Sequence, residues 1–377
     1  MRHVFLISLA LTALLLAGCG AVTSPVTVVQ TVEVEKVITA TPEPMTEEAM
    51  APAGSIQLTG AGATFPFPLY SRWFYEYAFV DPAVRFNYQS IGSGGGIRQL
   101  TEGTVDFGAS DAPMNDDELA AAKAKVLHFP TVIGAVAVTY NLEGVDTALR
   151  FTPDVLADIF LGGITRWNDP RLAAVNPGVT LPAEDILVVH RSDGSGTTFI
   201  FTDYLSSVSD AWKSGPGKGK DVQWPVGLGG KGNEGVTGQV KQTPGAIGYV
   251  ELAYAKENHL PVAELKNQAG NWVKPSLEGA TACAAGVASN LPADTDFRVS
   301  IVNAPGADAY PISSFTWLLV YQNMDNADKA KKLVDFITWA LHDGEGEVAA
   351  LDYAPLPANM VDLEMKQLQM VTYPGKM

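Results

Sequence analysis

Hydrophobic and polar positions follow two different periods along most of the chain after Ser55. Short apolar runs rich in β-branched residues predict strands, and apolar residues spaced three and four apart predict helices. Two strongly apolar strands are expected at 131–140 and 246–252, and they bracket a segment with helices at 152–161 and 198–208. This alternation of strands and helices is typical of an α/β fold.

Three strand–loop–helix junctions stand out because small residues fill their loops. Unsatisfied N–H groups and the positive end of the helix dipole make a helix N-terminus suited to an anion. Each loop alone is explained by a tight turn, but three together, one of them carrying Arg191, favour a shared oxyanion site. The junctions join the predicted strands to the predicted helices at 55–59 and 66–79, at 84–89 and 97–100, and at 186–190 and 198–205.

A C-terminal helix is predicted from apolar residues that recur at helical spacing between Ala330 and Leu341. Asp325 or Asp328 is expected to cap its N-terminus. The apolar stripe is interpreted as core packing, with no ligand role.

The N-terminus predicts a secretion signal over residues 1–18. Its apolar run at 4–17 would rise only about 21 Å as a helix, less than the roughly 30 Å of a hydrocarbon core. The run ends in Leu-Ala-Gly before Cys19, which resembles the lipobox of bacterial lipoproteins and implies a lipidated Cys19; a plain signal peptide with an incidental cysteine is the alternative. Residues 19–54 are predicted to be a flexible tether. Cys283 is expected to be a buried lone thiol.

Composition narrows the possible functions. The 377 residues carry a formal net charge of −16, which argues against nucleic-acid binding and against electrostatic attraction to an anionic membrane. Five histidines are scattered without metal-ligand spacing, so no metal site is expected. No cofactor is expected either. The segment 227–233 lacks the spacing of a phosphate-binding P-loop, and the residues around Ser195 lack that of a nucleophile elbow. A hydrolase using Ser195 or Ser93 is therefore the weaker alternative to a binding protein.

Several long motifs occur at the predicted junctions and between them: GAGATFP at 60–66, YQSIGSGGG at 88–96, VDFGASDAP at 105–113 and RSDGSGT at 191–197. With these motifs in this order, the chain resembles the periplasmic phosphate-binding proteins from about Ser55 to near its C-terminus. The resemblance implies a two-lobed periplasmic-binding-protein fold of the α/β class, with mixed sheets and two crossover strands joining the lobes. The expected lobes are 55–135 with 250–377, and 136–249.

The same resemblance implies a phosphate ion clasped between the lobes. Asp111 would accept the proton that phosphate carries and sulfate lacks; alternatively, it caps a helix at 114–123. Arg191 would bind the anion; alternatively, it forms an ion pair with Asp193. The implied ligands are Thr64, Phe65, Ser93 and Asp111 from one side and Arg191, Ser195, Gly196 and Thr197 from the other.

The resemblance also implies a role and a location. The protein would deliver phosphate to the membrane permease and ATPase subunits of an ABC importer, and it would catalyse no reaction. The lipid on Cys19 would hold it outside the cytoplasm, in a periplasm or on the outer face of the membrane. A binding protein for another oxyanion, such as sulfate or molybdate, is the nearest rival function.

Overall fold

The computed structural model describes residues 54–376, and all of them fall in a single structural unit. The predicted signal peptide, Cys19 and tether residues 19–53 lie outside the described residues. No helix within 54–376 is long and apolar enough to cross a membrane.

Eleven named strands form two sheets in the described part of the chain. Eight make one mixed sheet in the order β2-β1-β3-β11-β4-β8-β6-β7, and three make a small sheet in the order β10-β9-β5. The strands are β1 (Ile56–Gly62), β2 (Val84–Ser90), β3 (Phe107–Ser110), β4 (Val126–Tyr140), β5 (Arg150–Phe151), β6 (Leu187–Arg191), β7 (Leu228–Gly230), β8 (Ala246–Glu251), β9 (Glu264–Lys266), β10 (Trp272–Val273) and β11 (Ser313–Tyr321).

The fully buried strand β4 runs through both halves of the large sheet. Its residues 126–135 pair antiparallel with β11, and its residues 136–140 pair antiparallel with β8. Strands β2, β1 and β3 are mutually parallel on one side, and β8, β6 and β7 are mutually parallel on the other. We call the half built on β2, β1, β3, β11 and residues 126–135 the first lobe, and the half built on residues 136–140, β8, β6 and β7 the second lobe.

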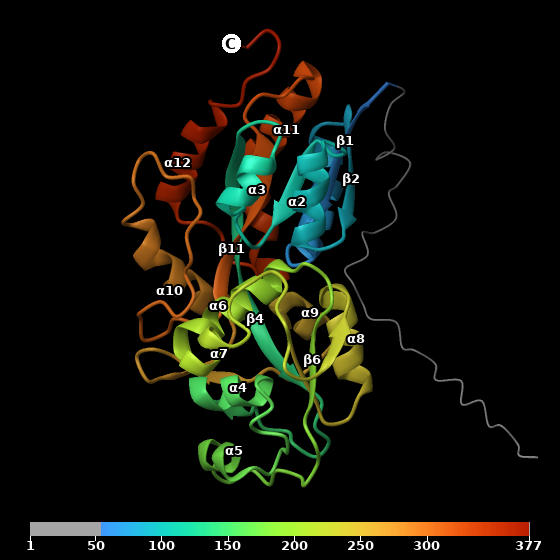
Figure 1. Cartoon of the computed structure of the whole chain (residues 1–377). Helices are drawn as coiled ribbons and strands as arrows, with labels where there is room; N and C mark the ends of the chain where they lie inside the picture. The colour runs from blue at the N-terminus through green and yellow to red at the C-terminus, as the bar shows by residue number, and fades with distance from the viewer. Residues whose placement is uncertain (1–53, 377) are drawn as a thin grey trace, which may run out of the picture. The chain divides into compact units, whose positions relative to one another are not determined.

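Helices cover both halves of the sheet (Figure 1). In the first lobe α2 packs on β1 and β3, and in the second α8 packs on β6 and β8. The helices are α1 (Phe67–Val80), α2 (Ser93–Glu102), α3 (Asp116–Ala121), α4 (Pro153–Phe160), α5 (Pro170–Val175), α6 (Gly196–Val208), α7 (Asp210–Ser214), α8 (Gly232–Gln242), α9 (Leu252–Glu257), α10 (Leu277–Ala288), α11 (Ala327–Ala340) and α12 (Ala358–Leu368), with 3-10 turns η2 (Asp343–Glu347) and η3 (Ala349–Leu351).

Each lobe has an aromatic core. In the first, the Phe86 ring lies 4.4 Å from that of Phe336 and stacks 4.5 Å from that of Phe74, measured between centroids. In the second, Phe201 stacks on Tyr249 at 4.3 Å. These contacts join helices to strands of the same lobe, so each half buries its own apolar surface.

The α/β class and the two-lobed fold predicted from the sequence are confirmed. Two local predictions were wrong. The helix after β2 begins at Ser93 rather than at Ile97, so the glycines after Ser93 lie inside its first turn. The C-terminal helix is capped by Asn326, whose side chain accepts from two backbone N–H groups, and neither aspartate is the cap.

The limits of the lobes within the chain stay a prediction. The change of partner along β4 falls between Ala135 and Val136. In addition, β9 pairs with β5 in the small sheet, which ties residues 264–266 to a segment from the middle of the chain.

Candidate functional site

Strand–helix junctions from the two lobes meet where the lobes contact each other (Figure 1). Strands β1 and β2 lead into α1 and α2 in the first lobe, and β6 and β7 lead into α6 and α8 in the second. The backbone N–H of Gly94 donates to the carbonyl of Gly194 across the lobes, at 2.8 Å. The carboxyl ends of parallel strands are the usual place for a ligand in such sheets.

Thr64 and Phe65 form the turn between β1 and α1, and both are buried. The Thr64 hydroxyl accepts hydrogen bonds from the backbone N–H and the side-chain amide of Asn233, at 3.1 and 2.8 Å. The carbonyls of Thr64 and Phe65 accept from the hydroxyls of Tyr254 and Tyr353, each at 2.6 Å. The turn is thus held by its carbonyls and by the Thr64 hydroxyl.

Four backbone N–H groups at three junctions share an unusual property. Buried N–H groups are almost always paired, yet within residues 54–376 these four donate to no protein acceptor. Their residues are at most 2% exposed. They belong to Thr64, Phe65, Ser93 and Thr197.

Ser93 begins α2 and lies against Asp111, which follows β3. The Ser93 hydroxyl accepts from the N–H of Asp111 at 3.2 Å and from the N–H of Gly196 in the other lobe at 3.1 Å. A Cβ on Gly196 would lie 2.5 Å from both the Ser93 hydroxyl and the Asp111 carboxylate. Only glycine therefore fits at this position with the lobes in contact.

Asp111 is 1% exposed and has hydroxyl partners rather than a cation. Thr316 of β11 donates to its Oδ1 at 2.8 Å, and the Ser93 hydroxyl donates to its Oδ2 at 3.5 Å. Burial raises the pKa of Asp111 to about 7, although Thr316, Arg191 and Ser93 oppose the rise. The alternative helix-cap interpretation of Asp111 was wrong, because α3 begins later and Asn115 caps it.

Arg191, the last residue of β6, has its side chain 1% exposed and forms a two-point ion pair with Asp193. Nε donates to one carboxylate oxygen at 2.8 Å and Nη2 to the other at 2.5 Å. Nη1 donates to the Thr197 hydroxyl at 3.3 Å, so Arg191 also faces α6. The ion pair considered as an alternative exists, and it leaves one edge of the guanidinium toward the other predicted ligands.

Asp193 differs from Asp111 in its ionisation. Burial opposes the charge, but the hydrogen bonds and the charge of Arg191 outweigh burial, so the pKa of Asp193 lies below its ordinary value. Its Oδ1 also accepts from the N–H of Gly232 at 3.0 Å, which ties it to the start of α8.

Ser195, Gly196 and Thr197 form the start of α6. The Ser195 hydroxyl caps the helix by accepting from the N–H of Thr198 at 3.0 Å. The Thr197 hydroxyl accepts from Arg191 and, at 3.2 Å, from the amide of Asn233. The structure therefore places all eight predicted ligands in one buried hydrogen-bonded region.

Sequence reasoning missed two polar residues of this region, Asn233 and Thr316. Asn233 stands in the segment 227–233, which was given no ligand role, although its glycines before a helix were a usable signal. Thr316 lies in the middle of the buried strand β11, where nothing in the local pattern distinguishes it.

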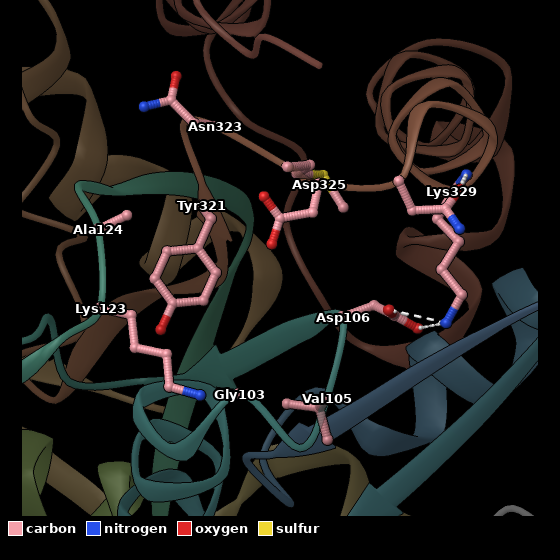
Figure 2. A pocket seen from close by; sticks show the side chains of 11 residues that line it. Gly103, Val105, Asp106, Lys123, Ala124, Tyr321, Asn323, Asp325 and Lys329 are labelled. Atoms are coloured by element: carbon pink, nitrogen blue, oxygen red, sulfur yellow. Dashed lines mark hydrogen bonds and ion pairs between the residues drawn. The ribbon is translucent and has the colours of Figure 1, made fainter. Parts of the chain in front are cut away.

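A cavity of about 400 Å³ lies elsewhere, in the first lobe (Figure 2). None of the predicted ligands lines it. Across it Lys329 of α11 donates to both carboxylate oxygens of Asp106, at 2.9 and 2.8 Å, and Asp106 accepts from the N–H of Thr59 in β1. This ion pair joins elements of one lobe. No group of metal-ligating side chains that could hold an ion occurs within 54–376.

Residues 47–343 match the model of a family described as a PBP superfamily domain. The chain is 47% identical over 309 residues to a protein from Xylella fastidiosa (strain Temecula1) named phosphate-binding protein PstS, covering 81% of this chain and 83% of the relative. A protein of the same name from Methanocaldococcus jannaschii is 40% identical over 337 residues, covering 84% of this chain and 87% of the relative.

Solved structures show the same fold at lower identity. A phosphate-binding protein from Stenotrophomonas maltophilia aligns with a TM-score of 0.65 at 21% identity, covering 83% of this chain and 94% of that chain. A putative phosphate ABC transporter substrate-binding protein from Clostridium perfringens, solved with bound phosphate, aligns with a TM-score of 0.58 at 17% identity, covering 80% of this chain and 100% of that chain.

Proposed function

The chain belongs to the PBP superfamily and, within it, to the phosphate-binding proteins, and from this premise we propose that it binds inorganic phosphate between its lobes and delivers it to an ABC importer for phosphate uptake. One observation supports the anion site above the others: four buried N–H groups in the strand–helix junctions have no acceptor within the described residues. Such groups favour an oxyanion, which supplies the missing acceptors.

The proposed ligands combine many donors with one acceptor. N–H groups, hydroxyls and Arg191 all donate to phosphate oxygens, and only Asp111 accepts. The net charge of −16 opposes an anion, but distant charges are screened over a Debye length of about 8 Å at physiological salt. Local donors therefore decide the affinity. The ligands are Thr64, Phe65, Ser93, Asp111, Arg191, Ser195, Gly196 and Thr197.

Asp111 gives the site its preference for phosphate over sulfate. Both ions are tetrahedral and would satisfy the donors about equally well. Above the pKa of Asp111, phosphate still keeps a proton that it can donate to the ionised carboxylate, whereas sulfate has none and would oppose that carboxylate with a charged oxygen. Leaving buried acceptors unpaired costs several kcal/mol.

Calorimetric titration of residues 55–377 with phosphate, in the presence and absence of sulfate at matched ionic strength, tests the function. We expect tight phosphate binding that sulfate does not displace. Asp111→Asn, whose amide can donate to sulfate, should allow sulfate to compete. Sulfate binding by the wild type would identify the rival oxyanion function, and unchanged discrimination in Asp111→Asn would remove Asp111 from the ligand set.

Closure of the lobes accompanies binding in this proposal, with lobe limits at 55–135 with 250–377 and at 136–249. Ligands contributed by both lobes require their approach, the hinge motion of such proteins. Phosphate should reduce the radius of gyration of ligand-free protein in small-angle scattering. An unchanged profile at saturating phosphate would mean that the lobes are fixed.

Delivery involves the permease and ATPase subunits of the importer and a lipid on Cys19. Liposomes containing those subunits should take up phosphate only with this protein added. Full-length protein should carry acyl mass and partition into detergent, and Cys19→Ala should not. An unmodified mature chain that begins elsewhere would contradict the anchor.

The protein performs no catalysis in this proposal. Its relatives are named as binding proteins and not as enzymes. Incubation with phosphomonoesters should release no phosphate above the buffer rate, and turnover lost in Ser195→Ala or Ser93→Ala would establish the hydrolase instead.

A further inference from the structure

Asn233 lies in the first turn of α8 and is 0% exposed, although the family motifs do not place it among the phosphate ligands. Its side chain lies between two of the proposed ligands from opposite lobes. The amide nitrogen is 2.8 Å from the Thr64 hydroxyl and 3.2 Å from the Thr197 hydroxyl. One side chain therefore contacts a threonine hydroxyl from each lobe.

The orientation of this amide is fixed by the backbone. The N–H of Glu251, at the end of β8, donates to Oδ1 of Asn233 at 3.0 Å. A backbone N–H can only donate, so the oxygen of the amide must face Glu251. The two hydrogens of Nδ2 must then face the two threonine hydroxyls.

A hydroxyl has one proton to donate and two lone pairs that accept. Both lone pairs of Thr64 are used, because Asn233 donates to that oxygen from its amide and from its backbone N–H. Both lone pairs of Thr197 are used by Asn233 and by Nη1 of Arg191. Neither hydroxyl donates to a protein acceptor within residues 54–376.

We propose that Asn233 is a positioning residue that forces the Thr64 and Thr197 hydroxyls to act only as donors toward the ligand. This inference rests on the proposed phosphate site. With their lone pairs occupied, the hydroxyls can bind only unprotonated oxygens of the anion. The protonated oxygen of phosphate is thereby directed to Asp111, so Asn233 and Asp111 together set how the ion is oriented.

Ser93 differs from the two threonines, because its hydroxyl donates to Oδ2 of Asp111 at 3.5 Å and its lone pairs are occupied by the backbone. Its hydroxyl accepts from the N–H groups of Asp111 and Gly196. A hydroxyl fixed by main-chain donors cannot be reversed by a side-chain change. Asn233 is therefore the position at which donor direction can be altered by mutation.

Asn233→Asp tests the inference while preserving shape and the Glu251 bond. Its second oxygen would accept from both threonine hydroxyls, which would then turn lone pairs toward the anion. We expect phosphate affinity to fall about tenfold or more for each reversed hydroxyl. Asn233→Ala, which only frees the hydroxyls, should lose about tenfold or less. Equal losses in the two variants would overturn the proposal and indicate a packing role.

The added charge of Asn233→Asp needs a control, which Thr197→Val provides because valine keeps the shape and removes one hydroxyl. In a calorimetric double-mutant cycle, the affinity loss caused by Asn233→Asp should be at least about threefold smaller in the Thr197→Val background. Additive losses would mean that charge alone acts, and would overturn the proposal.

Two further outcomes are separable. If the wild type does not bind phosphate, the proposed function fails, whatever Asn233 does. If thermal unfolding shows that Asn233→Asp is not folded, the same cycle with Asn233→Ala decides, because its loss should also shrink when the Thr197 hydroxyl is absent. Additivity there would overturn the positioning role.

Discussion

Asp111 after β3 and Asp193 after β6 are both largely buried carboxylates in the same site, yet their surroundings shift their pKa values in opposite directions. Asp193 receives two hydrogen bonds from Arg191 and has a lowered pKa. Asp111 accepts a hydrogen bond from the Thr316 hydroxyl, and burial raises its pKa to about 7. A buried carboxylate stays ionised where a cation faces it and gains affinity for a proton where only hydroxyls do.

This difference assigns phosphate affinity and discrimination against sulfate to different residues. Asp193 neutralises and orients Arg191, so the site carries a fixed donor fork without a large excess of positive charge. Asp111 is left as an acceptor that tolerates a ligand bearing a proton. Phosphate affinity should therefore depend mainly on the second lobe's pair, and discrimination mainly on the first lobe's carboxylate.

The largest expected effect comes from breaking the pair. Arg191→Ala removes donors from the ligand and leaves Asp193 buried without its cation, which typically costs about 3–5 kcal/mol of folding free energy. We expect at least a tenfold loss of phosphate affinity, since each charge-assisted bond is worth about 1.5–3 kcal/mol. Calorimetry and chemical denaturation measure the two effects.

Arg191→Lys is the matched control for charge without the planar fork. It should retain more stability than Arg191→Ala but lose affinity, because lysine cannot satisfy Asp193 at two points. Wild-type affinity in Arg191→Ala would restrict Arg191 to its ion pair.

Asp111→Asn should change the pH dependence of stability. The folded pKa of Asp111 lies above its unfolded value, so the folded state holds an extra proton and this stabilising contribution is lost as pH rises toward and through about 7. Asparagine does not titrate. Between pH 5 and pH 8 the variant should gain roughly 2–3 kcal/mol relative to wild type, at about 1.4 kcal/mol per pH unit.

Urea denaturation of ligand-free wild type and Asp111→Asn at pH 5 and pH 8 measures this difference. Other buried carboxylates, such as Glu251 and Glu364, are common to both proteins and cancel in the comparison. If the difference in stability is the same at both pH values, Asp111 ionises as an ordinary surface aspartate does.

The sequence could predict the partner of Asp193 but not the partner of Asp111. The link between Arg191 and Asp193 was visible as a candidate ion pair two residues apart. The partner of Asp111 was not, because Thr316 lies 205 positions away in the chain. Long-range pairing through a central strand leaves no trace in local periodicity.

The same reasoning explains the local errors. Gly94 to Gly96 have low helix propensity, so the start of α2 was expected after them rather than at Ser93. There the glycines bring the helix backbone close to β1; a Cβ on Gly96 would lie 2.5 Å from the Ala61 carbonyl. Asn326 was overlooked as a cap because Asp325 and Asp328, which lie on either side of it, are also residues that commonly cap helices. Tertiary contact and side-chain geometry, rather than composition, decided both positions.

Thr316→Val should sharpen the contrast between the two carboxylates. Thr316 lowers the pKa of Asp111 by donating to its Oδ1, so removing the hydroxyl should raise that pKa further. At pH 8 the variant should lose about 1.5 kcal/mol of stability, the lower range for a bond to a charged group, and less at pH 5. In the Asp111→Asn background this dependence on pH should disappear; its persistence would assign the effect to packing in β11.

The smallest effect should come from an ion pair that joins the two lobes. Lys220 of the second lobe contacts Glu118 of α3 in the first at 2.7 Å, with side chains 16% and 24% exposed. The carbonyl of Lys220 also accepts from the N–H of Ser195 at the start of α6. Lys220→Met keeps that backbone bond and removes only the charge, so it should favour the open lobes slightly. Such pairs are worth about 0.2–1 kcal/mol, which predicts a loss of phosphate affinity of up to about fivefold, declining at high salt.

Lys329→Met is the control, because its partner Asp106 lies in the same lobe (Figure 2) and closure does not change that pair. It should lower stability by a similar amount and leave affinity unchanged, and equal affinity losses in the two variants would show that the pair between lobes has no special part in closure.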